Sequence, residues 1–117
     1  HGVRSTEDPA LIEELRTAHV HLEVCPSSNV QVNVYGTYAD HPINRLYESG
    51  LSVSVNTDTR TITNITLTHE YEKLHQMFGW DETHFLQCNL HALRAAFLPE
   101  AIKQRLEDRL RAGYAAR

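Results

Sequence analysis

The fold of this chain is decided by one stretch, Leu51–Asp58, which reads LSVSVNTD. Val53 and Val55 alternate with serines, and alternation of β-branched residues favours a short buried strand with the valines on one face. The chemistry changes from apolar to oxygen-rich after Val55, so the strand delivers Asp58 at its C-terminal tip. Because catalytic groups of parallel α/β proteins lie at the C-terminal ends of strands, Asp58 is a candidate metal ligand or base. The alternative is that Asp58 only caps the next turn.

The elements around this strand are predicted from capping residues and hydrophobic spacing. Asp8 and Pro9 are typical of a helix start, and the helix is expected to turn Leu11, Ile12 and Leu15 inward. A second strand is predicted over 20–25, where apolar and polar residues alternate up to a proline. Helices are predicted over 9–17, 42–49, 66–78, from 81 to about 96 and over 99–113, and the segments 26–40 and 59–64 are expected to be irregular.

Two strands joined through a helix predict a parallel sheet, because such a crossover returns the chain in the same direction. Two parallel strands alone do not form a stable domain, since parallel sheets are normally larger and covered on both faces. The chain also begins at His1 and not at a methionine. We therefore expect it to be part of a larger protein that supplies the missing strands.

Composition excludes several classes of protein. The 117 residues allow one domain or part of one, and the net charge of -4 offers no basic surface for nucleic acid. No apolar stretch approaches the ~20 residues that cross a bilayer, so no membrane partner is expected. Cys25 and Cys88 lie far apart and predict neither a zinc finger nor a disulfide framework. Two lone cysteines fit a reducing, cytoplasmic location.

Polar residues follow three successive predicted strand ends. They are the pair HG at 1–2, the run CPSSN at 25–29 and the run NTD at 56–58. A glycine after His1 commonly lets the backbone turn tightly at a strand end. Three polar strand ends, each followed by a helix or loop, are typical of the upper face of a (β/α)8 barrel.

These motifs resemble the C-terminal third of the adenosine deaminases. The likeness is carried by HGV at 1–3, LEVCPSSN at 22–29, HP at 41–42, SVNTD at 54–58, LTHEY at 67–71 and AFL at 96–98. It covers nearly the whole chain in the right order and spacing. The resemblance implies an α/β fold in which residues 1–117 are the C-terminal segment of one (β/α)8 TIM barrel, incomplete without its N-terminal part.

The resemblance also implies site residues and a reaction. Asp58 matches the family's strand-tip zinc ligand, and a carboxylate suits a catalytic zinc that keeps an open water position. His1 matches the catalytic histidine beside the zinc-bound hydroxide, which adds to C6 of the purine while ammonia leaves. Many members carry a second acid after the ligand, in contact with the purine N7. This chain has Thr59 there, which can hydrogen-bond but holds no charge.

The family also needs two paired histidine ligands, a third histidine and a glutamate acid/base that would precede His1. The other histidines are predicted to have surface or capping roles; they are His19, His21, His41, His69, His75, His84 and His91. Cys25 is predicted to be a buried strand-end residue, with a nucleophile as the alternative. The function expected of the complete protein is zinc-dependent deamination of adenosine or deoxyadenosine. Another aminopurine substrate, or a non-catalytic barrel that has lost its metal, remains open.

Overall fold

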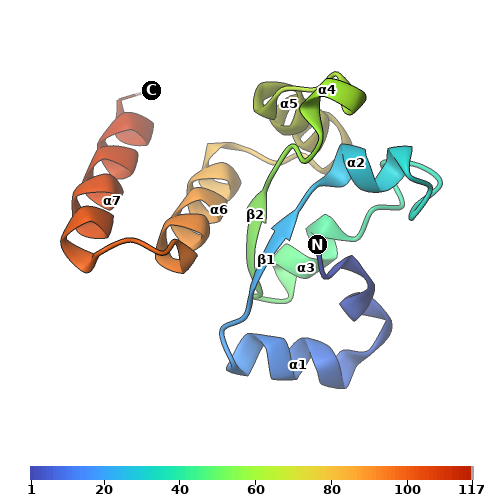
Figure 1. Ribbon diagram of the computed structural model, residues 1–117, viewed down its shortest axis with the longest axis horizontal. Helices are drawn as coiled ribbons and strands as arrows, with labels where there is room; N and C mark the ends of the chain where they lie inside the picture. The colour runs from blue at the N-terminus through green and yellow to red at the C-terminus, as the bar shows by residue number, and fades with distance from the viewer. Residues whose placement is uncertain (117) are drawn as a thin grey trace.

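The structure, a computed structural model, describes residues 1–116, and its helices surround a central pair of strands (Figure 1). η1 is a 3-10 helix, and the other helices are α-helical. In chain order the elements are η1 (Val3–Glu7), α1 (Pro9–Thr17), β1 (His21–Val24), α2 (Pro26–Gln31), α3 (Ile43–Glu48), β2 (Ser52–Val55), α4 (Arg60–Thr63), α5 (Leu67–Phe78), α6 (Glu82–Ala95) and α7 (Glu100–Ala115).

The strands β1 and β2 pair in parallel, with Leu22 opposite Val53 and Val24 opposite Val55. The chain leaves β1 through α2 and α3 and returns to β2, which is the predicted crossover. The predicted α/β class with parallel strands is therefore confirmed. Within residues 1–116 the sheet has two strands and does not close a barrel.

One face of the sheet is apolar and the other is polar. On the polar face, Nδ1 of His21 lies 2.8 Å from Oγ of Ser52, and Nε2 lies 3.0 Å from Oγ of Ser54. Glu23 shares this face and is exposed. The valines of both strands point the other way and are buried. The alternation predicted for 51–55 is thus confirmed, and it separates the hydrophobic core from a polar face on which Ser54 is buried as well.

The core is built from the strand valines and apolar side chains of α3, α5 and the segment that begins α6. Ile43, Leu46, Leu74 and Trp80 are 0% exposed. Burying each such side chain contributes about 1.5–3 kcal/mol of transfer free energy. The indole of Trp80 has a polar atom to satisfy, and its Nε1–H donates to Oδ1 of Asn44 at 2.7 Å. The core therefore fixes the sheet against the helices that follow it.

Most predicted helix boundaries are confirmed. The carboxylate of Asp8 accepts hydrogen bonds from the backbone N–H groups of Ala10 and Leu11 at the start of α1. Asp81 caps α6 in the same way, and Gly79 ends α5 in the left-handed conformation at φ 69°. A capping residue lies within a few residues of the backbone groups that it binds, so helix ends of this kind can be predicted from the sequence alone.

Four predictions on local structure were wrong or incomplete. Gly113 does not end the last helix, which continues to Ala115; an exposed glycine costs only about 1 kcal/mol there. Leu11 is 38% exposed, although Ile12 and Leu15 are partly buried. The segments expected to be irregular contain α2 and the one-turn α4. A further helix, η1, was not predicted, because a single turn is too short to show a hydrophobic period.

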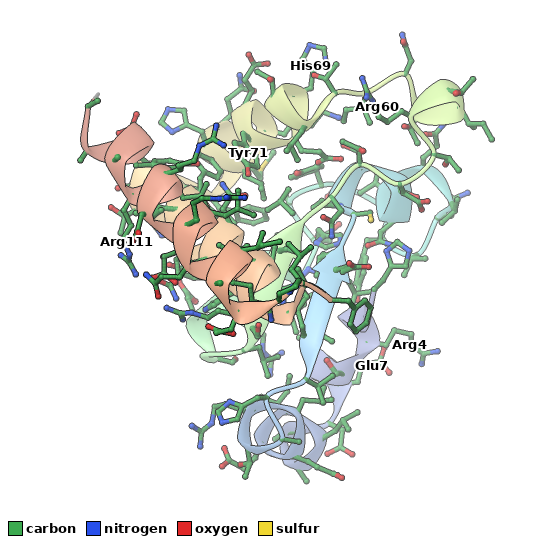
Figure 2. All side chains as sticks on the ribbon, turned by 60° about the vertical axis from the view of Figure 1, so that its left-hand side comes forward. Arg4, Glu7, Arg60, His69, Tyr71 and Arg111 are labelled. Carbon is green, nitrogen blue, oxygen red and sulfur yellow. The ribbon has the colours of Figure 1, made fainter. Side chains whose placement is uncertain are left out.

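The last helix, α7, lies against α6 at one end of the molecule (Figure 1). Ile102, Leu106 and Leu110 on this helix are partly buried, whereas Arg111 projects outward and its guanidinium lies 2.6 Å from the carboxylate of Glu107 (Figure 2). Arg105, Asp108, Arg109 and Arg111 are exposed and form a solvated face of this helix. Among residues 1–116, no helix is both long and apolar enough to cross a bilayer.

Candidate functional site

The carboxyl ends of β1 and β2 meet at one edge of the sheet because the strands run parallel. The N–H of Asn56 donates to the carbonyl of Val24 at 2.8 Å, which extends the ladder one step beyond β2. Cys25 and Asp58 therefore leave the sheet on the same edge, beside His1. One side-chain ligand atom from each of these three residues lies within 4.8 Å of the others.

Asp58 is held in an unusual backbone conformation, with φ at 53°. Aspartate tolerates this left-handed region better than most residues, because its short side chain can hydrogen-bond locally. Its Oδ2 accepts a 2.8 Å hydrogen bond from Oγ of Ser28, and its side chain is 36% exposed. Helix α4 begins after Thr59 and has no side-chain cap, so Asp58 is not a capping residue. Its carboxylate is both fixed and open.

His1 is turned onto this carboxylate by Gly2, which has φ at +66°. A Cβ at Gly2 would lie 2.7 Å from Cδ2 of Leu22, so the position needs glycine for space as well as for conformation. Nε2 of His1 lies 3.7 Å from Oδ2 of Asp58, and its Nδ1 lies 3.3 Å from Nδ2 of Asn29. His1 and Asp58, which the resemblance assigns to one zinc site, therefore lie close together in space.

His41 is buried behind Asn29 at 2% exposure. Burial lowers the pKa of its ring to about 4, so His41 is neutral at pH 7. Its Nδ1 accepts the backbone N–H of Ile43 at 3.2 Å, and its Nε2 lies 3.0 Å from Oδ1 of Asn29. The capping role predicted for His41 is confirmed, but a surface role is not. His41 thus contacts Asn29, which in turn contacts His1.

Glu70 is a buried acid that contacts the first turn of α2, and it is 0% exposed. Its carboxylate accepts the N–H of Ser27 at 3.0 Å and the O–H of Tyr38 at 2.9 Å. Burial and the neighbouring Glu70 carboxylate raise the pKa of Tyr38. The ammonium of Lys73 completes the cluster through a 3.0 Å hydrogen bond to Oγ of Ser27. Ser27 directly precedes Ser28, so this cluster anchors the turn that holds Asp58.

Cys25 is buried at the end of β1, as predicted. Burial and the nearby carboxylate of Asp58 raise the pKa of its thiol to about 11. The thiol is therefore protonated at neutral pH, whereas nucleophilic and metal-binding cysteines are thiolates. These observations favour the structural interpretation of Cys25 over the nucleophile.

Thr59 lies directly after Asp58, at the exposed start of α4. Its carbonyl accepts both the N–H and the Oγ1–H of Thr63 at 2.9 Å, which holds the turn in place. The side chain of Thr59 therefore starts from a fixed backbone at the rim of the site. This location is compatible with the predicted contact to a substrate.

The remaining histidines do not gather at the site. His69 projects outward from α5, on the same surface as Arg60 (Figure 2). His84 belongs to the capping box of α6, and Nδ1 of His75 lies 2.8 Å from the carbonyl of Trp80. Nδ1 of His91 lies 3.3 Å from the backbone nitrogen and from the carbonyl of Val53. The predicted surface and capping roles fit His69 and His84, but His91 is half-buried between α6 and β2, so its predicted role was wrong.

Sequence comparison assigns the family. The family model described as adenosine deaminase matches residues 1–113. The chain belongs to the adenosine deaminase family. It is 41% identical over 115 residues to the adenosine deaminase of Lacticaseibacillus casei, and 38% identical over 106 residues to the adenine deaminase of Sinorhizobium fredii. These alignments cover 98% and 91% of this chain but 34% and 33% of the relatives. The chain thus spans about a third of the length of these family members.

Solved structures match the fold of this chain. The adenine deaminase of Arthrobacter aurescens matches with a TM-score of 0.91 and 28% identity, over 96% of this chain and 34% of that protein. An amidohydrolase of Burkholderia ambifaria, solved with bound Zn, matches with a TM-score of 0.79 and 20% identity, over 100% and 35%. The predicted fold is therefore confirmed: the chain is part of a TIM-barrel deaminase fold and contributes two of its parallel strands.

Sequence reasoning did not predict the residues that support Asp58 and His1. Ser28 and Asn29 belong to the polar strand end that marks the site, but nothing in their spacing indicates which residues they contact. His41 carries only the signal of a histidine before a helix. Glu70 lies on an amphipathic helix, where a glutamate is normally solvated. A charged residue on the inner face of α5 was the one available sign of a buried network.

Proposed function

We propose that the complete protein to which this segment belongs removes the 6-amino group of a purine by hydrolysis. The observation that carries this proposal is the pairing of His1 and Asp58 at 3.7 Å, on the carboxyl edge of two parallel strands. Relatives described as adenosine and adenine deaminases, at 41% and 38% identity, support the aminopurine class. His1 and Asp58 are proposed as functional residues, and their presence favours an enzyme over a non-catalytic barrel.

A zinc ion is the proposed cofactor, with Asp58 as one ligand. The donor set fits this role in part, because Ser28 occupies Oδ2 of Asp58 and leaves Oδ1 for a metal ion. The remaining ligands are proposed to come from the N-terminal part of the barrel. Zinc in such a site supplies Lewis acidity and lowers the pKa of a bound water to about 7. The bound Zn in the Burkholderia ambifaria amidohydrolase is in keeping with this proposal.

The protein side of the chemistry is divided between three residues. Ser28 fixes the carboxylate of Asp58 by hydrogen bonding, so that the ligand is oriented before a metal binds. His1 presents Nε2 on the side of its ring that faces Asp58, where it can donate or accept a proton. We propose that Thr59 hydrogen-bonds the purine edge. The neutral threonine replaces an acid at this point, so it contributes a hydrogen bond without a charge.

The proposed substrate is adenosine or deoxyadenosine, with inosine or deoxyinosine and ammonia as products. Adenine is the second candidate substrate, because an adenine deaminase is 38% identical to this chain. Both substrates present the same reacting C6 and differ in the sugar at N9. Thr59 lies where the purine is proposed to be read, so it does not by itself choose between a nucleoside and a free base.

One experiment tests the function and separates the two substrates. The complete protein is purified, its zinc content is measured, and the ultraviolet change on deamination is followed with adenosine, deoxyadenosine and adenine. Asp58→Asn serves as the inactive reference, and Asp108→Asn on the outer face of α7 is the matched control. Turnover of adenosine with about one zinc per chain is expected. A zinc-free protein that is inactive on all three substrates would refute the proposal.

A further inference from the structure

A chain of directed hydrogen bonds leads from the start of α3 to His1. It begins with the backbone N–H of Ile43, which lies 3.2 Å from Nδ1 of His41. A backbone N–H can only donate, so Nδ1 of His41 must be an unprotonated acceptor. Since burial keeps this ring neutral, with its pKa lowered to about 4, its single hydrogen lies on Nε2. The tautomer of His41 is thus determined by a main-chain group.

The next step sets the orientation of Asn29. Nε2–H of His41 lies 3.0 Å from Oδ1 of Asn29, and a donor at this position requires the amide oxygen and not the amide nitrogen. The amide nitrogen of Asn29 is thereby turned to His1, whose Nδ1 is 3.3 Å away. An amide nitrogen can only donate, so Nδ1 of His1 is an acceptor in turn. The hydrogen of a neutral His1 ring therefore lies on Nε2.

We propose that His41 and Asn29 are positioning residues that fix His1 as its Nε2–H tautomer, with the hydrogen on the side of Asp58. The tautomer itself follows from the hydrogen bonds alone, and only its catalytic consequence rests on the proposed function. Without these two residues, an exposed imidazole exchanges freely between its tautomers, and the nitrogen that faces Asp58 loses a defined role.

The contact between His1 and Asp58 supports the same assignment independently. Nε2 of His1 lies 3.7 Å from Oδ2 of Asp58, and a carboxylate oxygen is an acceptor. A hydrogen on Nε2 would be attracted to this carboxylate oxygen. An unprotonated Nε2 would instead place its lone pair opposite the lone pairs of the oxygen, and the two would repel each other. Asn29 and His41 are 4% and 2% exposed, so water competes little for their hydrogen bonds.

The test reads the tautomer directly, by nitrogen-15 magnetic resonance of ring-labelled histidine in the complete protein. Protonated and unprotonated ring nitrogens have well separated shifts, and the signal lost in His1→Gln identifies His1. Spectra are recorded at alkaline pH, to observe the neutral form of the ring. We expect the hydrogen on Nε2 in the unaltered protein. A hydrogen on Nδ1 would overturn the proposal, and this outcome needs no variant to fold.

Variants then test the two positioning residues. Asn29→Asp replaces the amide donor by an acceptor of the same shape, so the hydrogen of His1 is expected to move to Nδ1. Asn33→Asp adds the same charge at an exposed position and should leave the spectrum unchanged. His41→Leu should give a mixture of tautomers, and His41→Gln, whose amide can still donate to Asn29, should restore a single one. If the His1 signal is unchanged in folded Asn29→Asp or His41→Leu, these residues do not fix the tautomer of His1 and the proposal is wrong.

Kinetics separate positioning from binding. If the proposed deamination holds, Asn29→Asp should lower kcat by on the order of 10²-fold, within the range for general acid–base catalysis, and change KM by less than about threefold. If the complete protein does not catalyse deamination, neither the unaltered protein nor the variant has a kcat to compare. The ring shifts would still report the tautomer, so the two failures are distinguishable.

Discussion

The buried carboxylate of Glu70 gives the most specific prediction for stability. Glu70→Ala removes an acceptor that is 0% exposed and that binds the N–H of Ser27 and the O–H of Tyr38. Both donors are then left without this partner in the interior. Glu70→Gln preserves the shape and one acceptor oxygen, but it turns an amide N–H toward one of the two donors.

The expected loss follows from these two hydrogen bonds. An unsatisfied buried donor costs about 1–3 kcal/mol, so two of them predict a decrease of about 2–6 kcal/mol for Glu70→Ala. Glu70→Gln should lose about half as much, because one donor keeps its acceptor. Glu72→Ala, on the exposed face of the same helix, should lie within about 0.5 kcal/mol of the unaltered protein.

The assay is urea unfolding of the complete protein, together with its zinc content. Loss of the Ser27 anchor should also loosen Ser28, and through it Asp58, so Glu70→Ala is expected to bind zinc more weakly than Glu72→Ala. Equal unfolding free energies for Glu70→Ala and Glu72→Ala would refute the reasoning. That result would mean that water or a rearranged side chain replaces the carboxylate at no net cost.

Three further predictions follow from the site. Asp58→Asn, whose side chain tolerates the same left-handed backbone, should keep the fold and lose at least about tenfold in zinc affinity, measured by metal titration. Thr59→Asp places a charge at the proposed purine contact and should change kcat/KM for adenosine by about tenfold or more, whereas Thr61→Asp should not; equal effects would remove Thr59 from the substrate site. The neutral, buried His41, with a folded pKa of about 4 against 6.5, contributes stability that is present above pH 6.5 and lost as the pH falls to 4. His41→Gln should therefore show a smaller loss of unfolding free energy between these pH values, by up to about 3 kcal/mol, and an identical pH dependence would contradict this.

Local signals in the sequence predicted most of the secondary structure. Alternating valines mark β2, and aspartates mark the starts of α1 and α6, because strand faces and helix caps depend on neighbours within a few residues. The same reasoning failed at Gly113 and at the short α4. A single glycine costs too little to end a helix that is otherwise favourable, and one helical turn is too short for a periodic pattern.

The sequence by itself determined the parallel arrangement of the strands, the position of Asp58 at a strand tip, and the family through its ordered motifs. Only the tertiary structure decided which side chains meet there. His1 reaches Asp58 because Gly2 turns the chain across Leu22. Asn29 is oriented toward His1 because His41, at the end of the segment that follows α2, returns to contact it. Such contacts depend on the path of the whole chain through space, and no pattern of neighbouring residues encodes them. The strand tip offers a carboxylate, and the fold around it fixes the atoms that it meets.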